Sequence, residues 1–194
     1  MMRLLSLLAA LLVSGQAAAE DVTVRVTTPA GEPVAHAVVS LPGALPASPA
    51  DVVHEMAQED LQFDPFVLVV PQGAEVVFPN RDRVRHHVYS FARDNAFELE
   101  LYGREQERSV VFDAQGNVPI GCNIHDDMIA YIRVVDTPHA VVTNADGVAV
   151  LEGVAAGPVT VWHPYANAEN NQLVLDAPAD GSTLDVTLDV HGRR

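Results

Sequence analysis

Apolar and polar residues alternate over short stretches of this chain, which is the pattern of β-strands that bury one face. Near the N-terminus, Val22, Val24 and Val26 alternate with polar neighbours. The other expected strands are rich in β-branched and aromatic residues, and they cover 38–41, 66–70, 75–78, 87–91, 97–101, 110–112, 129–135, 148–151, 159–162, 173–175 and 184–190. Only the stretch 52–61 has a composition for which we expect a short helix.

Turn-forming residues separate these segments. Combinations of Gly with Pro, Gln, Asn or Asp occur at 29–31, 72–73, 115–117, 145–147 and 179–181. Many short strands joined by such turns are typical of β-sandwiches and β-barrels. The pattern therefore predicts an all-β protein.

Residues 1–19 have a different pattern. Arg3 precedes an apolar run from Leu4 to Val13, and Ala17, Ala18 and Ala19 come just before Glu20. A basic start, an apolar run and small residues at its end describe a secretory signal peptide. The run is shorter than the about 20 apolar residues that a membrane-spanning helix needs. We predict cleavage before Glu20, export to the periplasm, and a mature chain without a membrane span.

The chain has a single cysteine, Cys122, which excludes an internal disulfide bond. Cys122, His125 and Met128 place a thiolate, an imidazole and a thioether on one short stretch, and His86 and His87 supply a further imidazole upstream. A trigonal site of one Cys and two His, with a weak axial Met, is the blue-copper arrangement. Because neighbouring residues of a strand point to opposite faces, only one of His86 and His87 is expected to reach the metal.

These residues resemble those of a known family. The Cys-x2-His-x2-Met loop at 122–128 resembles that of amicyanin, a small cupredoxin, and Asn80-Arg81 followed by His86 and Val88 resembles amicyanin and the plastocyanin family. Segments 86–91 and 121–125 also resemble chains often labelled methylamine utilisation proteins. The resemblance implies one mononuclear type 1 copper ion, with the ligands His86, Cys122, His125 and Met128.

The same resemblance covers about residues 60–136 and implies a Greek-key cupredoxin β-sandwich at 50–137. It also implies that Asn80 hydrogen-bonds the backbone of the cysteine loop. This chain departs from the family at His87, where an Asn usually follows the first histidine ligand.

The flanks resemble a second family. Residues 22–41 and 143–162 look like strands of carboxypeptidase regulatory-like, or transthyretin-like, β-domains. This likeness implies a small Ig-like sandwich split between 20–43 and 138–191, with the cupredoxin domain inserted between the halves. Two consecutive domains are the alternative.

The charge distribution limits the possible partners. The chain has a formal net charge of −15, and its eleven basic residues are all arginine. Because nucleic-acid binding needs clustered positive charge, we expect no nucleic-acid partner. Arg81, Arg83 and Arg85 form a local basic stretch, which is either a docking patch for an acidic redox partner or a solvated loop that balances nearby aspartates.

The favoured function is the transfer of single electrons between redox partner proteins, without enzymatic activity. The alternative is copper binding for delivery or sensing. Zinc fits less well, because Met128 is a poor zinc ligand. A second copper site at His54 and Met56 and a ligand role for His163 are not favoured, since neither belongs to a recognisable motif.

Overall fold

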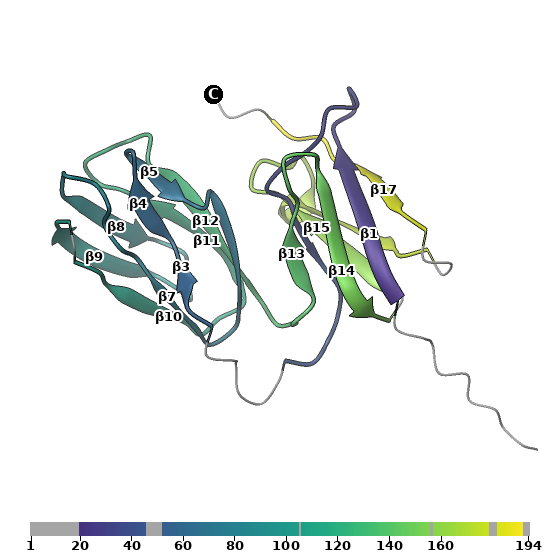
Figure 1. Ribbon diagram of the computed structural model, residues 1–194, viewed down its shortest axis with the longest axis horizontal. Helices are drawn as coiled ribbons and strands as arrows, with labels where there is room; N and C mark the ends of the chain where they lie inside the picture. The colour runs from purple at the N-terminus through teal and green to yellow at the C-terminus, as the bar shows by residue number, and fades with distance from the viewer. Residues whose placement is uncertain (1–19, 46–51, 105, 156, 179–181, 192–194) are drawn as a thin grey trace, which may run out of the picture.

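The computed structural model describes residues 20–45, 52–104, 106–155, 157–178 and 182–191. These residues form strands and one short 3-10 helix, η1 (Glu169–Asn171), with no α-helix among them. The expected all-β class with two β-sandwiches is confirmed. Figure 1 shows the strands in two groups, and we call β3 to β12 the central sandwich and β1, β2 and β13 to β17 the flanking sandwich.

The central sandwich consists of two sheets and a hairpin. The larger sheet has the order β6-β12-β11-β8-β9, with the strands β6 (Val67–Pro71), β8 (His86–Ser90), β9 (Phe97–Tyr102), β11 (Gly116–Gly121) and β12 (Ile129–Val135). The smaller sheet has the order β10-β7-β3, with the strands β3 (His54–Glu55), β7 (Ala74–Val77) and β10 (Ser109–Phe112). The hairpin pairs β4 (Ala57–Glu59) with β5 (Gln62–Asp64).

The core of the central sandwich follows from the two-residue period of its strands. On β11 and β12 the buried positions alternate with more exposed ones, because successive side chains point to opposite faces. The inward side chains meet those of the smaller sheet in one apolar cluster, which includes Phe78, Val88, Phe112, Ile120, Cys122, Met128 and Ile132. The cysteine and the methionine of the predicted site therefore belong to this core.

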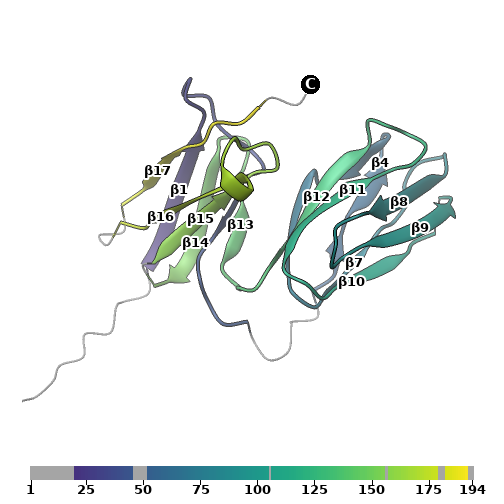
Figure 2. The ribbon, with the colours of Figure 1, turned by 180° about the vertical axis from the view of Figure 1, so that it is seen from behind.

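The flanking sandwich also has two sheets. One has the order β14-β1-β17, with the strands β1 (Glu20–Thr27), β14 (Val148–Val154) and β17 (Leu184–Thr187). The other has the order β13-β2-β15-β16, with the strands β2 (Val38–Ser40), β13 (Ala140–Val142), β15 (Pro158–Trp162) and β16 (Gln172–Asp176). Strands that precede the central sandwich in sequence thus pair with strands that follow it, and Figure 2 shows these strands together from behind.

The expectation of a helix over 52–61 is wrong. His54 pairs with Val76 in a parallel ladder, and the amide of Met56 donates to the carbonyl of Val77 at 2.9 Å. Ala57 to Glu59 pair with Gln62 to Asp64 in the hairpin. Tertiary pairing with β7 and β5 overrides the weak local helix preference of this segment.

Strand β11 was not expected from the sequence, where only a turn at 115–117 is recognisable. Gly116, Asn117, Pro119 and Gly121 are all poor strand formers. The strand nevertheless pairs with β12 along its whole length, whereas its pairing with β8 is limited to Gly121 and Tyr89. Since a proline has no N–H for a ladder bond, Pro119 suits a strand that is fully paired on one side only.

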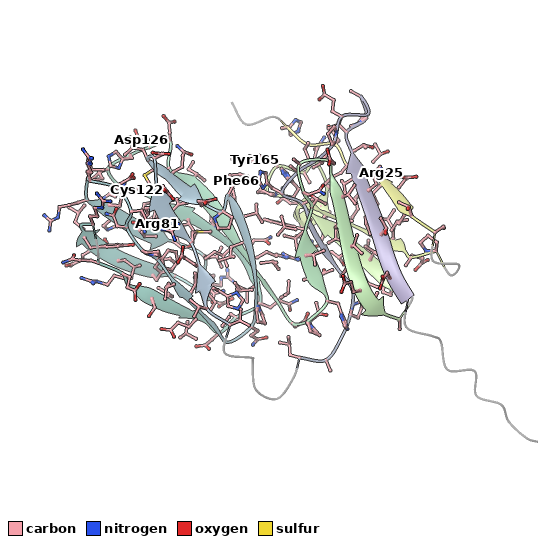
Figure 3. All side chains as sticks on the ribbon, in the orientation of Figure 1. Arg25, Phe66, Arg81, Cys122, Asp126 and Tyr165 are labelled. Atoms are coloured by element: carbon pink, nitrogen blue, oxygen red, sulfur yellow. The ribbon has the colours of Figure 1, made fainter. Side chains whose placement is uncertain are left out.

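The two sandwiches contact each other through apolar and aromatic side chains. The ring centroids of Phe66, just before β6, and Tyr165, after β15, lie 6.0 Å apart, and Figure 3 shows both residues between the two groups of strands. Arg133 on β12 donates to Gln172 of β16 at 3.1 Å. The buried side chains at this contact are Val38, Val67 and Trp162.

Two expectations fall on parts of the chain that lie outside the described residues. They are the predicted signal peptide, 1–19, and the predicted turn at 179–181. Among the described residues, no helix has the length and apolar character needed to cross a membrane.

Candidate metal centre

The candidate metal centre lies at one end of the central sandwich, where β8 begins and β11 ends. Figure 3 shows Cys122 at this end, on the side of the molecule away from the flanking sandwich. The loop between β11 and β12 is closed by two backbone hydrogen bonds. The amide of Cys122 donates to the carbonyl of Met128 at 3.2 Å, and the amide of Met128 donates to the carbonyl of His125 at 3.0 Å. The ligand loop is therefore anchored on two paired strands.

Three of the four expected ligands lie together. The Nδ1 atom of His125 lies 3.6 Å from the Sγ atom of Cys122, and the Nδ1 atom of His86 lies 3.9 Å from the same sulfur. One ligand atom from each of these residues lies within 4.8 Å of the others. His86 and Cys122 are buried, while His125 is only partly buried. This arrangement could hold one metal ion.

The donor set fits a copper ion. Two imidazole nitrogens face one sulfur, so a metal between them would receive the trigonal Cys-His₂ set that is typical of blue-copper sites. The Nε2 atom of His86 is already hydrogen-bonded to Asp82, which leaves Nδ1 as the nitrogen available to a metal. Met128 is almost fully buried in the same apolar cluster as Cys122, at the end of the loop.

His86 and His87 have different environments, although both are buried. The Nε2 atom of His87 lies 2.8 Å from the Oε1 atom of Glu98, and its ring lies 5.8 Å from that of Tyr89. The pairing of β8 with β9 shifts register between His86 and Val88, so this part of β8 is irregular. Of the two neighbouring histidines, the structure places His86 beside Cys122 and His87 beside Glu98.

Among the described residues, the side chain of Asn80 does not hydrogen-bond the cysteine loop, contrary to what the family resemblance implies. Its Nδ2 atom donates to the carbonyls of Val84 at 2.9 Å and Tyr102 at 3.0 Å. Its Oδ1 atom accepts from the amide of Asp82 at 2.9 Å. Asn80 therefore holds the loop that leads into His86.

Asp82 is a site residue that the sequence analysis missed. Its Oδ2 atom lies 2.8 Å from Nε2 of His86, and its carboxylate also accepts from the amides of Asp60 at 2.9 Å and Leu61 at 3.1 Å. Burial alone would raise the pKa of Asp82, but hydrogen bonds from Leu61, His86 and Asp60 together hold it below its usual value. In the sequence, the only sign of this contact is that Asp82 comes four positions before His86. That spacing predicts no contact unless the shape of the loop between them is known.

A buried polar pair supports the same end of the sandwich. The Nε2 atom of Gln58 donates to the hydroxyl of Tyr102 at 2.7 Å, and that hydroxyl donates to the carbonyl of Phe78 at 2.7 Å. Burial, the largest influence, raises the pKa of Tyr102 to about 12. The phenol therefore stays neutral, and these bonds join β4 to β9 and to the carbonyl of Phe78.

The three arginines before His86 are not equivalent. Arg81 forms ion pairs with Glu55 and, at 3.4 Å, with Glu59. Arg83 and Arg85 are exposed and form no ion pair among the residues that the structure describes. The unpaired positive charge of this stretch is thus carried by Arg83 and Arg85.

The other candidate ligands considered in the sequence, His54, Met56 and His163, are not part of the candidate metal centre. Met56 is buried in the core, and His54 lies on β3, where burial lowers its pKa. His163 is buried near the contact between the sandwiches, and burial, followed by the proximity of His36, lowers its pKa to about 4. Within the described ranges, the one cluster of three or more such ligands is that of His86, Cys122 and His125.

Comparisons by sequence identify no relative of this chain. No protein family profile matches it, and no curated protein matches it significantly.

Solved structures show partial likeness. A purple cupredoxin from Nitrosopumilus maritimus is 18% identical, with a TM-score of 0.38, over 42% of this chain and 99% of that protein. Amicyanin from Paracoccus versutus is 22% identical, with a TM-score of 0.40, over 46% of this chain and 86% of that protein. A copper-containing nitrite reductase from Thermus scotoductus is 24% identical, with a TM-score of 0.42, over 58% of this chain and 28% of the reductase.

Proposed function

We propose that this chain is a type 1 copper protein that carries single electrons. His86 Nδ1, Cys122 Sγ, His125 Nδ1 and Met128 would hold the copper ion. The observation that supports this proposal is the convergence of two imidazole nitrogens on one buried sulfur, at 3.6 and 3.9 Å. This is the donor set of a blue-copper site, with His86 as the histidine that supplies the upstream ligand.

Bound copper would supply a one-electron couple between Cu(II) and Cu(I). The protein's part is to hold the ligands so that they move little between the two states. Cys122 and Met128 are in a packed core, and the ligand loop is closed by its own backbone hydrogen bonds. The electron comes from one redox partner protein and goes to another, so no bond of a substrate is made or broken. His125 is the most exposed of the three clustered residues, and we assign it the role of electron port.

The proposal extends to the organisation and location of the chain. Residues 50–137 form a cupredoxin domain inserted into a carboxypeptidase regulatory-like sandwich made of 20–43 and 138–191. The pairing of β1 with β14 and of β2 with β15 supports an insertion, because each pair joins the two flanks. Residues 1–19 act as a signal peptide that directs the protein to the periplasm.

Absorption and EPR spectra of the copper-loaded mature protein test this function. We expect strong visible thiolate-to-copper absorption in the wild type and none in Cys122→Ser, since the charge-transfer transition needs the thiolate. Circular dichroism of both proteins checks that the variant keeps its β-structure. A variant that keeps the absorption defeats the site assignment. A colourless wild type that binds only Cu(I) and passes it on would indicate copper delivery instead.

A further inference from the structure

The carboxylate of Asp82 connects two parts of the chain that are distant in sequence. One oxygen, Oδ2, lies 2.8 Å from Nε2 of His86 and also accepts from the amide of Leu61 at 3.1 Å. The other, Oδ1, accepts from the amide of Asp60 at 2.9 Å. Asp60 and Leu61 form the turn between β4 and β5, with φ values of 53° and 58°. A single side chain thus joins this turn to the histidine.

We propose that Asp82 is a positioning residue that aims His86 at the metal and lowers the reduction potential of the copper centre. This inference rests on the proposed copper site. A carboxylate that accepts a hydrogen bond from a ligating histidine fixes its tautomer and raises its basicity. At His86 the proton is then on Nε2, and the lone pair of Nδ1 points toward Cys122 Sγ.

The charge of Asp82 acts on the two copper states unequally. A negative charge held near the metal stabilises Cu(II) more than Cu(I), because the cupric ion carries the larger positive charge. The effect is not lost to solvent, since the side chain of Asp82 is only 14% exposed and that of His86 is fully buried. Burial reduces the screening that weakens exposed pairs.

Hydrogen bonds from the surrounding backbone fix the position of this carboxylate. Besides the amides of Asp60 and Leu61, which hold its oxygens, the backbone amide of Asp82 donates to Asn80 Oδ1 at 2.9 Å. Four hydrogen bonds, counting the one to His86, therefore hold this residue in place. A charge that is held in this way does not need to reorganise when the copper changes its oxidation state.

The midpoint potential of the copper-loaded full chain tests the proposal. Asp82→Asn keeps the size of the side chain and an oxygen that accepts from His86, but it removes the charge. We expect the Cu(II)-to-Cu(I) affinity ratio to fall about tenfold, which raises the potential by about 59 mV. Asp126→Asn is the matched control, because it removes one exposed carboxylate from the ligand loop beside His125, and it should shift the potential much less. Asp82→Glu should restore part of the wild-type value.

Two outcomes separate this inference from the proposed function. If the wild type binds no copper as a blue site, the proposed function fails. If the blue site forms and Asp82→Asn leaves the potential within the shift of Asp126→Asn, the inference about Asp82 is overturned.

A second test uses only the metal-free wild type, so its result does not depend on whether a variant folds. Nitrogen NMR, at a pH well above the usual histidine pKa of about 6.5, should find the His86 proton on Nε2. A proton on Nδ1 would contradict the role of Asp82, whatever metal the protein binds.

Discussion

Both ring nitrogens of His86 have defined neighbours. Nδ1 faces Cys122 Sγ at 3.9 Å, while Nε2 lies 2.8 Å from Asp82 Oδ2. His87, one position later, has Nε2 near Glu98 and a buried Nδ1 that has no hydrogen-bond partner within the described part of the chain. The two adjacent imidazoles therefore differ in their access to the thiol, and substitution of each should have a different effect.

We predict that His86→Gln removes the blue absorption and that His87→Gln retains it. The first change removes an imidazole nitrogen from the trigonal set, whereas the second affects a contact to the largely exposed Glu98, which should stabilise the fold by less than about 1 kcal/mol. Visible absorption of the two copper-loaded variants, prepared side by side, is the measurement. The reverse result would show that His87 is the ligand.

At the scale of elements, the position of each strand depends on contacts that are remote in sequence. The turn before β14 packs against β1: the amide of Val26 donates to the carbonyl of Gly147 at 2.8 Å. Gly147 has a φ of +72°, and a Cβ atom on it would lie 2.4 Å from the carbonyl oxygen of Val26. Both its conformation and its surroundings therefore require glycine.

We predict that Gly147→Ala lowers the free energy of unfolding more than Gly31→Ala does. Gly31 also has a positive φ, +83°, but nothing lies within 4 Å of the place of its Cβ. Gly31→Ala should cost about 1 kcal/mol of backbone strain, and Gly147→Ala should cost about 1–3 kcal/mol more for the clash with β1. Urea unfolding of the two variants gives the comparison, and equal losses would mean that the contact with Val26 relaxes freely.

At the scale of the whole molecule, the candidate metal centre lies away from the flanking sandwich. Figure 3 shows Cys122 on the far side of the central sandwich from Arg25 of β1. The flanking sandwich instead contacts the outer side of β6 and β12 through Phe66, Tyr131 and Trp162. The end that carries His125, Arg83 and Arg85 is therefore the part of the molecule that we expect to meet a redox partner.

We predict that replacing both Arg83 and Arg85 with Gln slows electron exchange with an acidic redox protein at low ionic strength. Exposed charges act mainly on the rate of encounter, so the difference should shrink as salt is added. Arg25→Gln is the control for a change of charge elsewhere, because Arg25 is also exposed but lies on the flanking sandwich, where it pairs with Asp185 at 3.2 Å. Stopped-flow rates over a range of salt concentrations measure this effect. Equal rates for the double variant and the wild type in low salt would exclude the docking patch.

Local patterns in the sequence predict much of the fold and part of the candidate site. Alternation of apolar and polar residues, as around Val24, depends only on which face of a strand is buried. Most strands can therefore be recognised from the sequence. Three of the four expected ligands, Cys122, His125 and Met128, are on one short loop, and their chemistry can be read without knowing the fold. Strand β11 and the segment at 52–61 were not predictable in this way, because pairing with neighbouring strands outweighs their local preferences.

By itself, the sequence determined the all-β class and the types of donor atom on the cysteine loop, since both follow from residue types at short spacing. Only the tertiary structure decided which of two adjacent histidines faces Cys122, because that depends on an irregular pairing of β8 with β9. It also brought Asp82 to His86, and strand β1 to β14, across separations that no local pattern records. Contacts of this kind form when buried polar groups and open strand edges find partners in the folded chain.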